Sequence, residues 1–130
     1  MDGEKDLDKL LKNMRPILNA GDYVFCSVQG KVPIDPREII LQFKEQEGTT
    51  LIIKKEAADL LNLDYNFIAS WITLTVHSSL EAVGLTAVFS KALSDAVISC
   101  NVVAAFFHDH IFVNRDDSGK AMDILSKFSA

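Results

Sequence analysis

The chain has 130 residues, a net charge of −5 and a hydrophobic content of 48%. These values predict one folded domain, or two small units that share a core, with no need of a metal or a disulfide. Basic residues are scattered, which argues against nucleic acid as a partner, and the longest apolar runs, such as 102–107, are far shorter than the ~20 residues that span a membrane.

The N-terminus and the two cysteines both favour the cytoplasm. Residues 1–6 are charged, and no apolar segment follows that would make them a signal peptide. Cys26 and Cys100 lie inside apolar segments, which is typical of buried, reduced thiols. We therefore expect a cytoplasmic protein.

The chain opens with a predicted amphipathic helix. Asp6 can cap its N-terminus, and Pro16 and the Asn-Ala-Gly sequence at 19–21 end it. The segment 23–28 then predicts a strand that is apolar on both faces. The apolar residues of the helix recur at helical spacing: Leu7, Leu10, Leu11 and Met14.

The segment 36–47 leaves two alternatives open. Asp35, Pro36 and Glu38 supply a capping residue, a proline at the first helical position and an acidic residue in the first turn, which together predict a helix. Residues 39–43 could instead form a strand. The sequence by itself does not decide between them.

The rest of the chain predicts a regular order of elements. A β-branched strand at 49–53 and a short helix at 55–61 complete the N-terminal half. From residue 70 on, the hydropathy pattern predicts strand, helix, strand, strand and helix, at 71–76, 81–96, 99–107, 110–113 and 116–128.

This βαββα order lacks one strand of a ferredoxin-like βαββαβ unit. The missing strand must come from the N-terminal half, with 23–28 and 49–53 as candidates, or from another subunit. We therefore expect two interleaved units. The absence of a linker rich in proline, glycine or serine between Leu63 and Ser70 agrees with this expectation.

Several segments carry a resemblance to a known family. Residues 71–86 (WITLTVHSSLEAVGLT), 101–103 (NVV) and 108–113 (HDHIFV) resemble a family of small tandem ACT-domain proteins, mostly of unassigned function. The resemblance reaches back to 23–26 and 45–48. The layout is also similar to the paired ACT units of aspartokinases and of cytosolic arginine sensors.

The resemblance implies an α+β fold with two ferredoxin-like ACT-type units, an N-terminal one at 1–65 and a C-terminal one at 66–130. It also implies a homodimer through side-by-side pairing of sheets, and amino-acid binding between units. Many ACT domains carry Asp-Pro-Gly at the first strand-to-helix turn. This chain has His-Ser-Ser-Leu-Glu at 77–81, so their ligand preferences do not transfer.

The turn after the strand 71–76 is the first candidate ligand site. A helix start offers free backbone N–H groups to a carboxylate, and Ser78 and Ser79 add hydroxyls. Gly84 costs about 0.5–1 kcal/mol relative to alanine in a helix, which a close ligand or backbone would explain. Alternatively, Ser79 merely caps the helix, and Gly84 relieves a contact between helix and sheet.

An amino acid at this turn would place its carboxylate near Ser78, Ser79 and Leu80 and its side chain against Val83 and Val102. We include these residues in the predicted ligand-binding set, together with Gly84.

Three further polar residues complete that set: Asn101, His108 and His110. Asn101 begins an apolar strand, so its amide could hold a ligand or bond a neighbouring loop. The two histidines share a strand face, and with His77 and Asp109 they could hold zinc. Asp109 suits a tight turn, however, which favours a satisfied turn and no metal.

No catalytic motif stands out in the sequence. There is neither a Gly-x-Ser-x-Gly elbow nor a nucleotide-binding glycine pattern, and a triad of Ser78 or Ser79, His108 and Asp109 would need all three groups in one cleft. We expect a non-catalytic regulatory protein that binds a small molecule, by resemblance an amino acid, and needs no cofactor. The alternative is a structural or protein-interaction dimer module without a functional ligand site.

Overall fold

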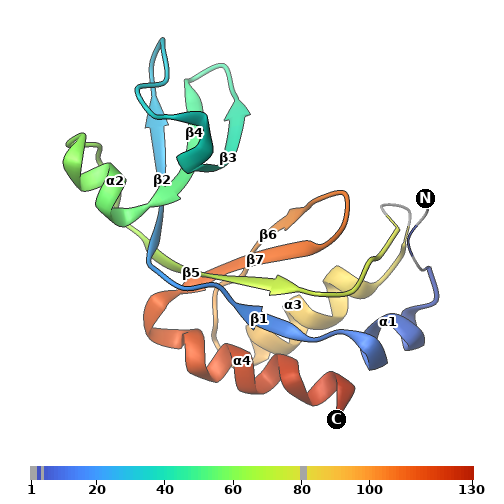
Figure 1. The fold of residues 1–130 in the computed structure, drawn as a ribbon. Helices are drawn as coiled ribbons and strands as arrows, with labels where there is room; N and C mark the ends of the chain where they lie inside the picture. Colours follow the sequence, from blue (N-terminus) through green and yellow to red (C-terminus); the bar gives the residue numbers. More distant parts are fainter. Residues whose placement is uncertain (1–2, 4, 80–81) are drawn as a thin grey trace. The chain divides into compact units, whose positions relative to one another are not determined.

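The computed structural model describes residues 3, 5–79 and 82–130, and the chain divides into two units. Unit 1 consists of Met1–Ala20 and Ser70–Ala130, and unit 2 consists of Gly21–Ala69 (Figure 1). Unit 2 is thus inserted between two segments of unit 1, so the expected interleaving is confirmed. The division into 1–65 and 66–130, which follows the order of the sequence, stays a prediction.

The sheet of unit 1 has the strand order β1-β5-β7-β6. β1 runs antiparallel to β5, and β6 and β7 form an antiparallel hairpin. This is the order of a ferredoxin-like unit in which β1 takes the place of the last strand. The strands, in sheet order, are Pro16–Leu18, the 70–74 part of β5 (Ile68–Leu74), Asp109–Asn114 and Asn101–Ala104.

The borrowed strand of unit 1 is β1, and neither 23–28 nor 49–53 takes that place. Ile17 lies opposite Thr73, and the Thr75 N–H donates to the Arg15 carbonyl oxygen at 2.9 Å. A proline is tolerated at the start of a strand, where its missing N–H breaks no ladder bond. The expectation that Pro16 only ends the preceding helix was therefore incomplete.

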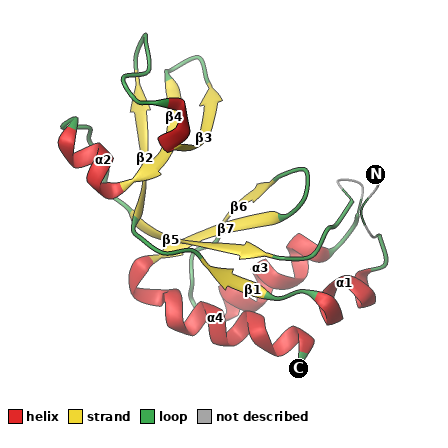
Figure 2. Cartoon of the chain, viewed as in Figure 1, coloured by secondary structure: helices red, strands yellow, loops and turns green. Residues whose placement is uncertain are grey.

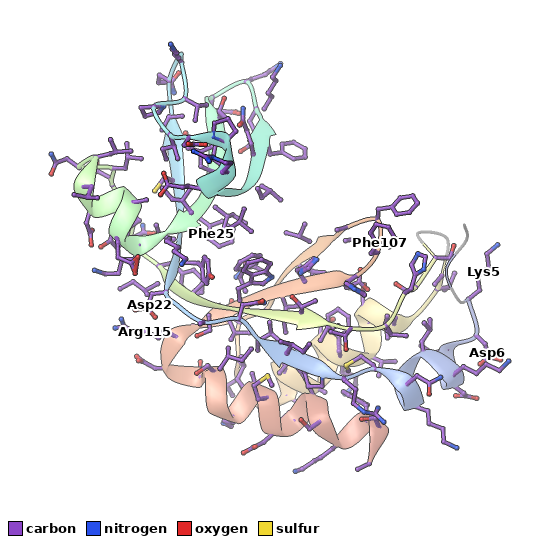
Figure 3. The ribbon with its side chains drawn as sticks, in the orientation of Figure 1. Lys5, Asp6, Asp22, Phe25, Phe107 and Arg115 are labelled. Atoms are coloured by element: carbon purple, nitrogen blue, oxygen red, sulfur yellow. The ribbon has the colours of Figure 1, made fainter. Side chains whose placement is uncertain are left out.

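Three helices cover one face of the unit 1 sheet (Figure 1). They are α1 (Leu7–Asn13), α3 (Leu85–Asp95) and α4 (Ser118–Ser126). Asp6, labelled in Figure 3, caps α1 as predicted, since its Oδ1 accepts a 3.2 Å hydrogen bond from the Lys9 N–H.

The core of unit 1 lies between these helices and the sheet. Each fully buried Leu, Ile or Phe there contributes about 1.5–3 kcal/mol from burial. The side chains with no exposed surface include Leu10, Met14, Ile72, Leu74, Phe89, Leu93, Ile111, Val113 and Leu125.

Unit 2 repeats the same architecture with different elements (Figure 2). Its strand order is β3-β4-β2-β5, where the contribution of β5 is Ile68 and Ala69. The chain therefore passes from unit 2 to unit 1 inside one strand. The elements of unit 2 are β2 (Tyr23–Val28), β3 (Ile39–Lys44), β4 (Thr49–Lys54) and α2 (Lys55–Leu60), which packs on β2 and β4.

The ambiguous segment 36–47 contains both predicted conformations in turn. Pro36–Glu38 is a single 3-10 turn, and the Asp35 carboxylate accepts a 2.9 Å hydrogen bond from the Arg37 N–H. Strand β3 then begins at Ile39 and pairs with β4. The capping signal was correct but served only one turn.

The C-terminal elements match the predicted order, with shifted bounds. Helix α3 begins at Leu85 and not at residue 81, because Gly84 has a φ of 98°, which no helical residue adopts. Within the described ranges, no helix is long and apolar enough to cross a membrane. The predicted fold class, α+β with two ferredoxin-like units, is confirmed.

Candidate ligand-binding site

A pocket of about 150 Å³ opens in unit 1 beside the start of α3. Three segments form its wall: the loop that follows β5, the first turn of α3, and the paired ends of the β6–β7 hairpin. The lining residues are Ser78, Ser79, Ala82, Gly84, Leu85, Thr86, Ala104 and Asp109. The structure thus brings together three predicted residues, Ser78, Ser79 and Gly84, with five that were not predicted.

The start of α3 is left open towards hydrogen-bond acceptors. Gly84 occupies the N-cap position, so no side chain caps the helix, and the first turn has no acidic residue. The first helical bond runs from the Val88 N–H to the Gly84 carbonyl oxygen at 3.0 Å. The N–H groups of 85–87 precede that bond, and they carry the positive end of the helix dipole.

Gly84 also explains how the N-terminal segment lies near this turn. A Cβ at Gly84 would stand 3.2 Å from Cδ2 of Leu7, and its φ of 98° disfavours any side chain. The glycine is therefore required by its backbone conformation and by Leu7. The predicted close approach is real, and the group that approaches is a side chain of α1.

Two buried polar side chains face the pocket. Ser78 and Asp109 are each only 7% exposed, and within the described residues neither side chain forms a hydrogen bond. No fully shielded side-chain oxygen or nitrogen in the described part of the chain lacks a partner, so their oxygens are reached from the pocket. Leaving a buried polar group unpaired costs about 1–3 kcal/mol. Such groups are typical of a binding site.

Burial raises the pKa of the Asp109 carboxyl, and the nearby His108 acts against this effect by lowering it. The position of Asp109 follows from its strand. It shares a face of β7 with Ile111 and Val113, which are both fully buried in the core. That alternation was visible in the sequence and could have identified Asp109 as a buried residue, where the turn interpretation did not.

Four predicted residues lie elsewhere or outside the described ranges. Val83 is 82% exposed and does not line the pocket. The Asn101 amide donates to the Phe112 carbonyl oxygen at 3.2 Å, and Val102 packs against the core of unit 1. Leu80 lies outside the described residues.

His110 belongs to a hydrogen-bond network on the sheet. Its Nδ1 accepts a 3.0 Å hydrogen bond from Nε1 of Trp71, and the Thr73 hydroxyl lies 3.1 Å away. The Asn19 amide donates in turn to that hydroxyl at 3.0 Å. An indole N–H can only donate, so Nδ1 of His110 carries no proton. Burial, and then the neighbouring His108, lowers the pKa of His110.

His108 does not join the pocket either. Its Nδ1 lies 3.4 Å from the Val76 carbonyl oxygen, and its ring centre is 6.4 Å from that of His110. The serine, histidine and aspartate of the conceivable triad therefore do not line one cleft. Among the residues that the structure describes, no three His, Cys, Asp or Glu side chains are grouped to hold a metal ion.

Comparison with known families and structures gives three kinds of result. Residues 2–70 match one ACT domain family and residues 66–127 match another, and neither match is to a catalytic family. No curated protein matches the chain by sequence. Solved structures match over most of its length.

One similar structure is a protein of unknown function from Vibrio cholerae, described as a possible transport protein. It is 45% identical, with a TM-score of 0.86 over 97% of this chain and 98% of that one. A protein from Agrobacterium tumefaciens is 16% identical, with a TM-score of 0.70 over 89% of each chain.

The regulatory subunit of aspartate kinase from Thermus thermophilus, in its ligand-free form, is 9% identical. Its TM-score is 0.59 over 88% of this chain and 97% of that one. At this level of identity, as for the Agrobacterium protein, the similarity concerns the fold alone.

Proposed function

The chain belongs to the ACT domain family, and on that premise we propose that it is a non-catalytic regulatory protein whose unit 1 pocket binds an amino acid. The observation that carries the proposal is the pairing of two complementary groups in one pocket. These are the uncapped start of α3 and the buried carboxylate of Asp109.

Each group suits one charged end of an amino acid. The N–H groups at the start of α3 fit a carboxylate, because they are directed outwards at the positive end of the helix dipole. Asp109 fits an ammonium group, which would neutralise the buried carboxylate and donate hydrogen bonds to it. Ser78 and Ser79 add hydroxyls that accept or donate.

The structure also offers a route from the pocket to the N-terminal segment. Gly3 packs directly on the pocket loop, since a Cβ there would stand 2.5 Å from the Ser78 carbonyl carbon and from the Ser79 nitrogen. A ligand that orders this loop would therefore also order the segment in front of α1. Such coupling regulates a partner only if the ligand prefers one arrangement over the other.

The proposal includes a cytoplasmic homodimer formed by side-by-side pairing of sheets. β6 is an outer strand of the unit 1 sheet, and a strand edge can pair with a second copy. Light scattering at tens of micromolar should give twice the chain mass. A monomer at that concentration would refute this part of the proposal.

A thermal-shift screen against the amino acids tests ligand binding. At 100 times its Kd a ligand adds about 2.7 kcal/mol, which is roughly 5–15 °C for a chain of this length. Asp109→Asn should lose the shift, whereas Asp123→Asn, the same change at an exposed position, should keep it. If no amino acid moves the midpoint by a degree, the proposal fails in favour of a structural or protein-interaction module.

A further inference from the structure

We infer that this pocket selects a small amino acid with an uncharged side chain, of the size of glycine, alanine or serine. The inference rests on the proposed function and adds a ligand class to it. Three features of the pocket carry it: the volume, the chemistry of the wall, and the rigidity of that wall.

The volume admits only a small molecule. An engineered protein cavity of about 150 Å³ holds benzene, which has about six non-hydrogen atoms. The pocket here has the same volume. Alanine equals benzene in non-hydrogen atoms, glycine has one fewer and serine one more, whereas lysine, arginine and tryptophan are much larger.

The wall offers no partner for a charged side chain. Asp109 is the one ionisable group among the described lining residues, and the ligand's ammonium group would occupy it. Ala82, Ala104 and Leu85 are apolar, and Thr86 offers a single hydroxyl. A second charge on the ligand would lose water and gain nothing in return.

The wall has little freedom to enlarge. Gly84, Ala82 and Ala104 have no side-chain rotamers, so rotation cannot open space at these positions. Leu85 is 3% exposed and is held in the core of unit 1. Ala104 is tied through its backbone to Asp109 on the opposite strand.

The pocket also has a defined depth. Ser78, Leu85 and Asp109 are buried and form its floor, whereas Thr86 and Ala104 are exposed and mark its mouth. With both charged ends of the ligand held by the floor and by the start of α3, a long side chain could leave only through this mouth. There it would find no enclosing contacts.

Calorimetry with matched ligands tests the inference on the full chain. L-Alanine should bind, and L-lactate, which replaces its ammonium group with a hydroxyl, should bind at least about 30-fold more weakly because Asp109 is then left unpaired. L-Alaninamide, which lacks the carboxylate, should also bind weakly. L-Lysine and L-tryptophan should bind at least about tenfold more weakly than L-alanine.

Variants of the wall separate size from charge. Ala104→Leu should fill the mouth and weaken L-alanine more than glycine. Val83→Ala, at an exposed position beside the pocket that does not line it, should change neither affinity. Circular dichroism of each variant shows whether it is folded.

The outcomes distinguish this inference from the proposed function. If lysine, arginine or tryptophan binds more tightly than alanine and the binding depends on Asp109, the size inference is wrong and the proposed function stands. If no amino acid binds, or if Asp109→Asn leaves binding unchanged, both are wrong.

Discussion

Nε1 of Trp71 donates a 3.0 Å hydrogen bond to Nδ1 of His110, and this bond determines which ring nitrogen of the histidine can carry a proton. The same nitrogen lies 3.1 Å from the Thr73 hydroxyl. A second proton on the ring would turn Nδ1 into a donor facing the Trp71 donor. The network therefore stabilises neutral His110.

Acid should weaken unit 1 through His110. Its pKa is lowered in the folded protein, first by burial and then by His108, whereas the unfolded histidine titrates near about 6.5. Below that pH the unfolded chain binds a proton that the folded chain resists, so the free energy of unfolding falls as the pH falls. Urea unfolding between pH 7.5 and 5 measures this, and His110→Gln should flatten part of the slope. An unchanged slope would contradict the assignment.

Asp109→Asn should stabilise the ligand-free protein at neutral pH while it abolishes ligand binding. Burial raises the pKa of Asp109, so the folded state disfavours its charge, and stability falls as the pH rises through the window above the unfolded value. Removing the charge should recover on the order of 1 kcal/mol. Thermal unfolding at pH 7 measures it, with Asp123→Asn as the neutral control. A loss of stability in Asp109→Asn would show that the carboxylate has a structural partner.

Gly3→Ala should disturb the pocket loop from outside the pocket. The new Cβ would stand 2.5 Å from backbone atoms of Ser78 and Ser79, so the N-terminal segment must shift. We expect weaker ligand binding and faster amide exchange at the loop. Gly119→Ala is the matched control, because its Cβ meets nothing within 4 Å in helix α4, and it should stabilise the chain by about 0.5–1 kcal/mol. Equal effects of the two substitutions would refute the contact.

Two phenylalanines should differ sharply in their contribution to stability. Phe89 has no exposed surface in the core of unit 1, so Phe89→Ala should cost about 3–5 kcal/mol. Phe107, labelled at the turn between β6 and β7 in Figure 3, is 62% exposed, and Phe107→Ala should stay within about 0.5 kcal/mol. Denaturant titration measures both. A large effect at Phe107 would mean that another surface covers it.

The cysteines should be unreactive in the folded protein. Burial raises the pKa of Cys100 to about 11, and the pKa of Cys26 is also raised, by burial and by the charge of Asp64. The thiolate is the reactive form, so labelling by a disulfide reagent at pH 8 should be slow until urea unfolds the chain. Rapid labelling of Cys100 without denaturant would disagree with its position against the core.

The sequence predicted most of the local structure, because long periodic segments reveal their own conformation. The stripe of α1 with its Asp6 cap, the strands 23–28 and 49–53, and the βαββα order after residue 70 are all present. The candidate site was predicted in part. Ser78, Ser79 and Gly84 line the pocket, whereas His108, His110, Asn101, Val83 and Val102 do not.

Two decisive features depended on tertiary structure. β1 has only three residues, too few to show a period, and it is a strand because the 70–74 part of β5 offers it an edge to pair with. Asp109 suits a turn by its residue type, and its burial depends on what packs around the start of β7. By itself, the sequence therefore determined the elements, the two ferredoxin-like units and their interleaving. Only the tertiary structure, through long-range pairing and burial, decided which strand completes unit 1 and which carboxylate faces the pocket.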